Sequence, residues 1–297
     1  MRKVGFFGGT GFVGTAFYNF VNRNSFPLQL FRISRNASRL GMHDCLDCDA
    51  NNQDTFVDLP DFDIVIHGVA DSTIGHQIAG YAKIEKSITT TINIAEFARL
   101  RGVKKIIYLS SGAVYGEALN PAEDLRELTL NLESPIVFYA LGKLSAERYL
   151  QSFCKEHNIS LTILRAFTFG GPDLPRDTHY ALGNFIQNVL NGEDITIKGD
   201  GKALRSFMHQ DDLSRVIGMM INDDQSNIYN VGSHEAVSIK ELAQRAISLS
   251  GKNLQIQIQN KHVPHSIDYV PNISKLLKDK DFRLNHTLDD IIRSMLP

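Results

Sequence analysis

The sequence predicts an α/β fold: a doubly wound parallel sheet combined with a smaller C-terminal α/β domain. Three observations predict it. Short apolar runs alternate with helical patterns through the first half of the chain, a glycine-rich turn joins the first run to the first helix, and no repeat or Pro/Gly/Ser-rich linker divides the 297 residues. Strands that alternate with helices form a parallel sheet covered on both faces.

The predicted elements follow one another along the chain. The first half gives strand 3–7, helix 15–23, strand 28–33, strand 64–68, helix 84–101 and strand 105–109. The second half completes the sheet with helix 139–156, strand 161–164, helix 211–221 and strand 228–231. These elements predict one doubly wound parallel sheet of the Rossmann type.

The domain boundaries follow from where this alternation stops. Residues 1–168, with about 206–236, are assigned to the sheet domain. Residues of about 169–205 and 237–297 are loop-rich, with short helices and an alternating strand at 254–258, and are assigned to a smaller substrate-binding domain. Because open α/β sheets bind ligands at the carboxyl ends of their strands, we expect the smaller domain to act as a lid there.

Composition excludes several classes of partner. The chain is 43% hydrophobic and 22% charged, with a net charge of −2. Since no basic run stands out, we expect no binding to nucleic acid or to a membrane surface. No apolar stretch reaches the roughly 18 residues of a membrane span, and glycines interrupt the first apolar run, so a cytoplasmic location is expected.

The three cysteines do not predict a metal centre. Cys45 and Cys48 form a lone C-x-x-C with no second pair, whereas a structural zinc site needs about four ligands. No metal is expected, and the thiols fit a reducing compartment.

A glycine-rich turn carries the first functional signal. In FFGGTGFVG the glycines Gly8, Gly11 and Gly14 follow an apolar strand and open a helix. Such a turn lets the backbone approach a pyrophosphate at the helix N-terminus. The predicted cofactor contacts of this turn are Gly8, Thr10, Gly11, Phe12, Val13 and Gly14.

The tip of the second strand indicates which cofactor is bound. An acidic residue about 18 to 20 positions after the turn accepts the ribose hydroxyl of NAD. Here LFRISRN places Arg32 there, with Ser34 and Arg35 close by. Guanidinium groups bind a 2′-phosphate through charge-assisted bonds, so NADP(H) is favoured and NAD(H) stays open.

A tyrosine and a lysine form the second signal. Tyr139 and Lys143, in YALGK, lie on one face of a predicted helix. A neighbouring ammonium lowers the pKa of a phenol, so Tyr139 is predicted as general acid or base and Lys143 as its partner and a cofactor ligand. Ser110 and Ser111 end the strand in IIYLSSGAVYG, where a hydroxyl can bond the same substrate oxygen.

Five motifs in this order resemble the extended short-chain dehydrogenase/reductase family, the NAD-dependent epimerase/dehydratases of nucleotide sugars: GGTGFVG, HGVA, SSGAVYG, YALGK and GDGKALRSFMHQDD. The resemblance implies catalytic roles for Ser111, Tyr139 and Lys143. It also implies that Asp49, Ala50, Val69 and Ala70 line the adenine and ribose side of the cofactor. His67, in HGVA, is expected to be structural.

The resemblance further implies how the substrate is held. Arg205 stands where the family contacts the substrate diphosphate, and Asn184 and Ser111 are assigned to the same ligand. Thr168 replaces the family's usual asparagine after the strand, and Lys86 replaces a frequent asparagine. A homodimer is expected, built from the helices at 84–101 and 139–156.

Two reactions and one non-catalytic role stay open at this point. In the family's 4,6-dehydratases an Asp-Glu pair follows the catalytic hydroxyl, but Gly112 and Ala113 stand there, so elimination is disfavoured. The arginine-rich second strand favours an NADPH-dependent reductase of an NDP-4-keto-6-deoxy sugar. The alternatives are an NAD-dependent nucleotide-sugar 4-epimerase and, from another class, a non-catalytic dinucleotide-binding sensor.

Overall fold

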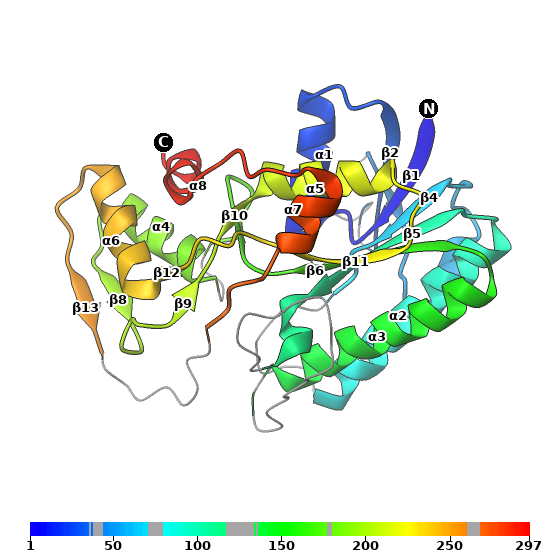
Figure 1. Ribbon diagram of the computed structural model, residues 1–297, viewed down its shortest axis with the longest axis horizontal. Coiled ribbons are helices and arrows are strands. Elements are labelled where there is room, and N and C mark those ends of the chain that lie inside the picture. Colours follow the sequence, from blue (N-terminus) through cyan, green and yellow to red (C-terminus); the bar gives the residue numbers. More distant parts are fainter. Residues whose placement is uncertain are drawn as a thin grey trace. The chain divides into compact units, whose positions relative to one another are not determined.

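A seven-stranded sheet forms the centre of the computed structural model, which describes residues 1–35, 37, 44–70, 80–116, 134, 136–176, 180–259 and 268–297. Its strand order is β11-β6-β5-β4-β1-β2-β3 (Figure 1). The pairs from β6 across to β3 are parallel. The order reverses between β1 and β4, which is the switch point where doubly wound sheets bind ligands. The predicted Rossmann fold is confirmed.

The sheet and its helices have these bounds. The strands are β1 (Arg2–Phe7), β2 (Leu28–Ser34), β3 (Cys45–Asp47), β4 (Ile64–His67), β5 (Lys105–Ser111), β6 (Ser160–Ala166) and β11 (Asn227–Val231). The helices are α1 (Phe12–Arg23), η2 (Gln53–Phe56), α2 (Gly80–Leu100), η3 (Gly112–Tyr115), α3 (Val137–Glu156) and α5 (Gln210–Ile221). Every strand predicted for the sheet is present, within a few residues of its expected bounds.

Burial on both faces explains why the central strands contain continuous apolar runs. Every residue of β4 and of β5 is buried. Helices α2 and α3 cover one face, and α1 and α5 cover the other (Figure 1). The rings of Phe7, Phe56 and Phe97 pack together in the core at centroid separations of 5.5 to 5.9 Å. Phe7 ends β1, so this packing fixes the strand that leads into the glycine turn.

The chain divides into two compact units. The first contains Met1–Gly116, 134–166 and Ser214–Tyr229, and the second contains Phe167–Leu213 and Asn230–Pro297. Residues 167–168, 206–213 and 230–236, which the sequence assigned to the sheet domain, belong to the second unit.

The second unit is built from short elements. Its strands are β7 (Phe169–Gly170), β8 (Ile195–Ile197), β9 (Leu204–Arg205), β10 (Met208–His209), β12 (Val237–Ser238) and β13 (Ile256–Ile258). Its helices are α4 (Ala181–Asn191), α6 (Ile239–Ser250), α7 (Ser274–Lys280) and α8 (Leu288–Met295). The buried Asp212 carboxylate accepts bonds from the amides of Asn285 and His286, which ties the segment before α8 to the start of α5.

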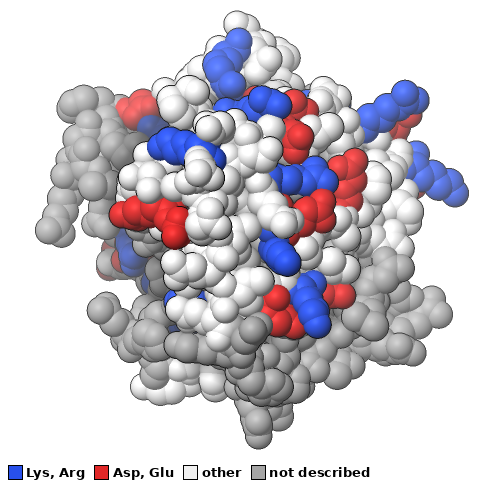
Figure 2. All heavy atoms as spheres, turned by 90° about the vertical axis from the view of Figure 1, so that its left-hand side faces the viewer, with Lys and Arg blue, Asp and Glu red and all other residues white. Residues whose placement is uncertain are grey.

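Surface charge is mixed where it can be followed. On the face drawn in Figure 2, lysines and arginines alternate with aspartates and glutamates. Among the helices that the structure describes, none has the length and apolarity that crossing a membrane requires.

Candidate active site

The glycine turn is too tightly packed for side chains. Gly8 has φ +83°, and a Cβ on it would lie 2.8 Å from the backbone carbonyl carbon of Gly68. A Cβ on Gly14 would lie 2.5 Å from the Cα of Gly9. The turn is held against β2, because the amides of Gly8 and Gly9 both donate to the Ile33 carbonyl. The turn therefore exposes backbone rather than side chains at the start of α1.

The start of α1 suits an anionic ligand. Gly11 is the N-cap residue, and the first turn carries no acidic side chain. The amides of Phe12, Val13 and Gly14 belong to that first turn, where backbone donors have no acceptor inside the helix. Thr10 is fixed beside it, since its Oγ1 donates to the Ser34 Oγ at 2.9 Å.

Arg32 is buried at the tip of the second strand. Its Nη2 donates to the Asp44 carboxylate at 2.6 Å, and its guanidinium stacks over the Tyr18 ring at 4.2 Å. Its Nε is buried and has no hydrogen-bond partner among the described residues. The hydrogen bond from Arg32 holds the pKa of the Asp44 carboxyl below its usual value. Arg35 is exposed.

Asp49 and Ala50 lie just beyond the edge strand β3. The Asp49 carboxylate accepts from the backbone and side-chain nitrogens of Asn51 at 3.0 and 2.9 Å. The Ala50 carbonyl accepts from the buried Asn93 amide at 2.9 Å. These hydrogen bonds hold the loop that follows β3.

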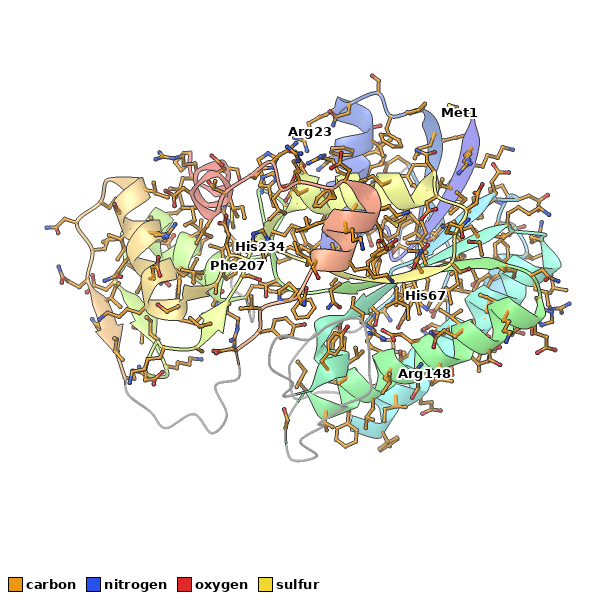
Figure 3. The ribbon with its side chains drawn as sticks, viewed as in Figure 1. Met1, Arg23, His67, Arg148, Phe207 and His234 are labelled. Carbon is orange, nitrogen blue, oxygen red and sulfur yellow. The ribbon has the colours of Figure 1, made fainter. Side chains whose placement is uncertain are left out.

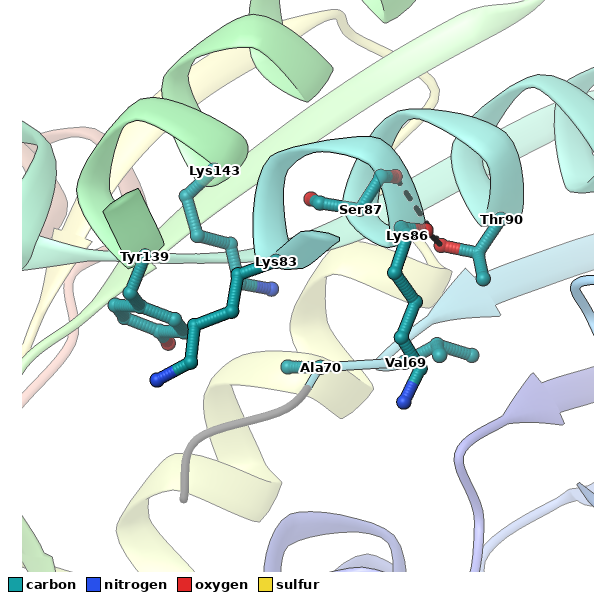
Figure 4. A pocket seen from close by; sticks show the side chains of 8 residues that line it. All are labelled: Val69, Ala70, Lys83, Lys86, Ser87, Thr90, Tyr139 and Lys143. Carbon is teal, nitrogen blue, oxygen red and sulfur yellow. Dashed lines mark hydrogen bonds between the residues drawn. The ribbon is translucent and has the colours of Figure 1, made fainter. Parts of the chain in front are cut away.

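Helices α2 and α3 approach closely at Gly142. A Cβ there would lie 3.1 Å from the Ser87 Cβ, and the Ser87 hydroxyl donates to the Gly142 carbonyl at 3.0 Å. This contact places Tyr139 and Lys143 of α3 opposite α2. Both line a pocket together with residues from α2 and from the segment that follows β4 (Figure 4): Val69, Ala70, Lys83, Lys86, Ser87 and Thr90.

Lys143 is buried, with 3% of its surface exposed. Its Nζ donates to the Leu109 carbonyl at 2.7 Å and lies 4.8 Å from the centre of the Tyr108 ring. Burial lowers the pKa of Lys143 to about 7, against the opposing influence of the Glu147 carboxylate. Lys143 lines the same pocket as Tyr139.

Ser111 ends β5 and begins η3. Its Oγ accepts from the Ala113 amide at 3.1 Å, so it caps that short helix. Its neighbour Ser110 points elsewhere and donates to the Glu147 carboxylate at 2.5 Å. The structure therefore separates the two serines that the sequence left together, and the hydroxyl of Ser110 is committed to Glu147.

A buried ion pair supports the strand ends. Arg165 donates to both carboxylate oxygens of Glu147 at 3.0 and 2.7 Å, and both side chains are at most 1% exposed. Arg165 also donates to the Tyr115 hydroxyl at 2.8 Å. The Glu147 carboxylate thus accepts from three donor atoms: the Ser110 Oγ and the Nε and Nη2 of Arg165. A buried charge requires such partners.

His67 is a core residue, as the sequence indicated. It is 1% exposed, and its Nε2 lies 2.9 Å from the Thr91 hydroxyl. Burial lowers the pKa of His67 well below its usual value, so it stays neutral. Figure 3 labels the buried His67 of β4 and the exposed Arg148 of α3.

The three residues predicted for substrate binding beside Ser111 all belong to the second unit. Thr168 lies between β6 and β7, Asn184 lies in the first turn of α4, and Arg205 ends β9. Arg205 is half-buried, and its Nη1 donates to the Leu204 carbonyl at 2.8 Å. Burial lowers the pKa of Arg205, with Asp268 and Tyr269 opposing.

The cysteines are free thiols. Cys45 lies in β3, and the buried Cys48 Sγ lies 3.4 Å from the Thr55 hydroxyl. Burial raises the pKa of Cys48 to about 11. Within the described ranges, no group of three or more metal-ligating side chains is gathered.

Sequence reasoning missed Glu147, Arg165, Lys83 and, as a pocket residue, Lys86. Glu147 follows Lys143 by four residues on α3, so helical spacing already placed it on the catalytic face. Lys83, Lys86, Ser87 and Thr90 show the same signal on α2, with spacings of three and four. Arg165 had no such signal, because its partner lies on another element.

The comparisons with known proteins identify the family of the chain. The sequence model of the NAD dependent epimerase/dehydratase family matches residues 6–232. The chain belongs to this family.

Two relatives show how far the likeness extends. The UDP-N-acetyl-alpha-D-glucosaminuronate decarboxylase of Bacillus cytotoxicus is 32% identical over 196 residues, which are 64% of this chain. The chain spans 60% of that relative's length. A putative UDP-glucose 4-epimerase of Methanocaldococcus jannaschii is 25% identical, with 79% of this chain and 78% of that protein covered.

Solved structures share the fold across the whole chain. The UDP-glucose 4-epimerase of Thermotoga maritima, solved with UDP-glucose, gives a TM-score of 0.86 at 19% identity, covering 99% of this chain and 97% of the other. RMD of Pseudomonas aeruginosa, solved with NADPH, gives 0.84 at 19% identity, covering 100% and 98%. At such identities the likeness concerns the fold.

Proposed function

We propose that the chain is an NAD(P)-dependent oxidoreductase of a nucleotide-linked sugar. One observation carries the proposal: Tyr139 lines the same pocket as Lys143, a buried lysine whose pKa is lowered to about 7. A lysine that titrates near neutrality beside a phenol is the arrangement that general acid–base work at a sugar oxygen requires.

The protein groups divide the proton chemistry among them. Tyr139 gives its phenolic proton to the substrate oxygen in reduction and takes it back in oxidation. Lys143, when protonated, would place a positive charge near the phenol and favour its phenolate form. Ser111, at the end of β5, orients the same oxygen. The Leu109 carbonyl fixes the lysine ammonium in place.

The glycine turn fits a nicotinamide dinucleotide. Side chains are excluded at Gly8 and Gly14, and α1 begins without an acidic residue. Asp49, Ala50, Val69 and Ala70 are proposed to line its adenine and ribose side. The bound cofactor would supply or accept the hydride at the sugar carbon.

The finer proposal is an NADPH-dependent reductase of an NDP-4-keto-6-deoxy sugar. Arg32, Ser34 and Arg35 at the tip of β2 would hold the 2′-phosphate, because guanidinium and hydroxyl groups bind phosphate oxygens. The buried Arg32 Nε without a partner supports this, since a phosphate oxygen would satisfy it. Gly112 and Ala113 argue against elimination of water.

One observation favours the 4-epimerase as a second candidate. The Asp44 carboxylate lies 2.6 Å from Arg32 and so brings a negative charge to the same strand tip. A carboxylate there would repel a 2′-phosphate and could accept a ribose hydroxyl of NAD. An epimerase keeps one NAD bound and returns the hydride that it removed.

The nucleotide sugar is proposed to reach Thr168, Asn184 and Arg205 of the second unit. Arg205 suits a diphosphate because its charge is delocalised and its fork is planar. The free thiols of Cys45, Cys48 and Cys154 support a cytoplasmic location.

Two measurements on the purified protein separate the candidates. Acid release followed by chromatography identifies any co-purified nicotinamide cofactor. Incubation with NADPH and an NDP-4-keto-6-deoxy sugar then follows absorbance at about 340 nm. Oxidation of NADPH in proportion to the reduced sugar supports the reductase. Bound NAD⁺ with interconversion of two hydroxy sugars, and no net cofactor change, refutes the reductase in favour of the epimerase.

A further inference from the structure

We propose that Tyr108 of β5 is a positioning residue for Lys143, because the face of its ring stabilises the charged form of the lysine ammonium. The inference rests on the proposed function, in which Lys143 acts beside Tyr139. It gives a role in that chemistry to a core tyrosine that precedes the two serines at the end of β5.

The ammonium of Lys143 lies over the ring of Tyr108. The Nζ is 4.8 Å from the ring centre. A cation over the face of an aromatic ring, within about 6 Å of its centre, is attracted by the electrons of the ring. Burial strengthens this attraction, and only 3% of Lys143 and 1% of Tyr108 are exposed. The contact therefore has the geometry of a desolvated cation–π interaction.

The ring complements the hydrogen bond that Lys143 makes with the backbone. The Nζ donates to the Leu109 carbonyl at 2.7 Å. An ammonium has three donors, and this bond uses one of them. Tyr108 and Leu109 are neighbours in β5, so one strand both accepts from the ammonium and offers it an aromatic face. Figure 4 shows the Lys143 side chain extending from α3 into the pocket that Tyr139 also lines.

Strand register fixes the Tyr108 ring in place. Tyr108 pairs with His67 of β4, and the two rings pack at a centroid separation of 4.9 Å. Side chains two residues apart on a strand share one face of the sheet. Ser110 follows Tyr108 by two residues and donates to Glu147 of α3. Tyr108 therefore faces the helix that carries Lys143.

Several charged or titratable groups face Lys143 in the part of the chain that the structure describes: Glu147 and Tyr139 of α3, His67 of β4, and Lys83 and Lys86 of α2. The Glu147 carboxylate raises the pKa of Lys143, but burial prevails and lowers it to about 7. His67 stays neutral, since burial lowers its pKa well below the usual value. An ammonium that titrates near neutral pH responds strongly to any further stabilisation.

The hydroxyl of Tyr108 has a different partner from the ring. It shares a hydrogen bond with the Ser87 side chain of α2. Burial raises the pKa of Tyr108 well above its usual value, so the phenol stays neutral and meets the ammonium with its ring face rather than with a phenolate charge. Substitutions can therefore remove the hydroxyl or the ring electrons separately.

The pKa of Lys143, measured in the cofactor-free protein, tests the proposal. The protein is labelled with ¹³C-lysine and titrated by NMR, and the Lys143 signal is the one that Lys143→Met lacks. Tyr108→Leu removes the ring, and Tyr108→Phe removes the hydroxyl alone. A trifluorinated phenylalanine in place of Tyr108 keeps the ring, but fluorine withdraws the electrons that attract a cation. Tyr229→Leu, which takes a buried ring from β11, is the matched control.

We expect Tyr108→Leu to weaken proton binding by Lys143 about 10- to 30-fold, because a desolvated cation–π contact is lost. The trifluorinated ring should weaken it by more than about twofold, and Tyr108→Phe and Tyr229→Leu should stay within about twofold of the wild type. If proton binding with the trifluorinated ring stays within about twofold of Tyr108→Phe, or if Tyr108→Phe weakens it as much as Tyr108→Leu, the proposal is overturned.

The comparison of the trifluorinated ring with Tyr108→Phe decides the question alone should Tyr108→Leu fail to fold. No substrate or cofactor takes part in the titration, so a failed reductase assay leaves its outcome unaffected. The two proposals can therefore fail separately.

Discussion

Replacing Lys143 by methionine should change how stability depends on pH. The lysine is buried, and its pKa is lowered from 10.5 to about 7. Between these values the unfolded chain binds the proton and the folded chain does not, so the stability of the wild type rises with pH across that window. Methionine keeps the volume of the side chain and removes this titration.

The expected size follows from the two pKa values. Going from pH 6 to pH 9.5, a lysine whose pKa moves from 10.5 to about 7 adds about 3 kcal/mol to the free energy of unfolding of the cofactor-free protein. The variant lacks this gain. At pH 6 the Lys143→Met variant avoids the cost of a buried ammonium. We expect this gain to exceed the stability lost with the hydrogen bond to the Leu109 carbonyl, which is worth about 1 kcal/mol.

Urea unfolding at both pH values measures the difference. The wild type should gain about 3 kcal/mol more than Lys143→Met between pH 6 and pH 9.5. Lys104→Met, which removes an exposed lysine, should follow the wild type within about 0.5 kcal/mol. Parallel curves for the wild type and Lys143→Met would refute the lowered pKa, and with it the reason for assigning Lys143 to Tyr139.

Three further predictions follow from other contacts. Glu147→Gln should destabilise the fold by about 3 to 5 kcal/mol, because Arg165 loses its buried charged partner. The same variant should move the alkaline limb of the pH profile of kcat to lower pH, because the Glu147 carboxylate raises the pKa of Lys143. An unmoved limb would contradict this. Asp44→Asn should tighten NADPH about 3- to 10-fold relative to NADH in fluorescence titrations, if Arg32 binds a 2′-phosphate; an equal change for both would disprove that role. Phe138 is 41% exposed on α3 and should contribute to a homodimer interface. Sedimentation of the wild type at micromolar concentration should give twice the monomer mass of 33.2 kDa, and Phe138→Glu should give the monomer. A monomeric wild type would exclude the dimer.

Local patterns made most of the sheet predictable. The strands β1, β4 and β5 each contain a continuous apolar run, because both faces of the sheet are covered there. The edge strand β3 escaped prediction, since its three residues are half-buried or exposed and carry no periodicity. Its place depends on pairing with β2, which is not a local property.

Helical spacing made one part of the site predictable from the sequence. Tyr139 and Lys143 lie one turn apart, and their common pocket follows from that spacing. The Arg32–Asp44 pair depends on the register of β2 against the edge of the sheet, and the Glu147–Arg165 pair joins a helix to a strand. Such pairs arise from tertiary packing, which a single motif does not encode.

The turnover of Tyr139→Phe tests the central claim most directly. The substitution removes the transferable proton and leaves the ring, so NADPH affinity should stay within about twofold while kcat for the 4-keto sugar nucleotide falls by 10² to 10⁴, roughly the worth of general acid catalysis. The control is Phe138→Tyr on the neighbouring residue, which should keep wild-type kcat. Retention of more than about a tenth of wild-type kcat by Tyr139→Phe would show that another group moves the proton.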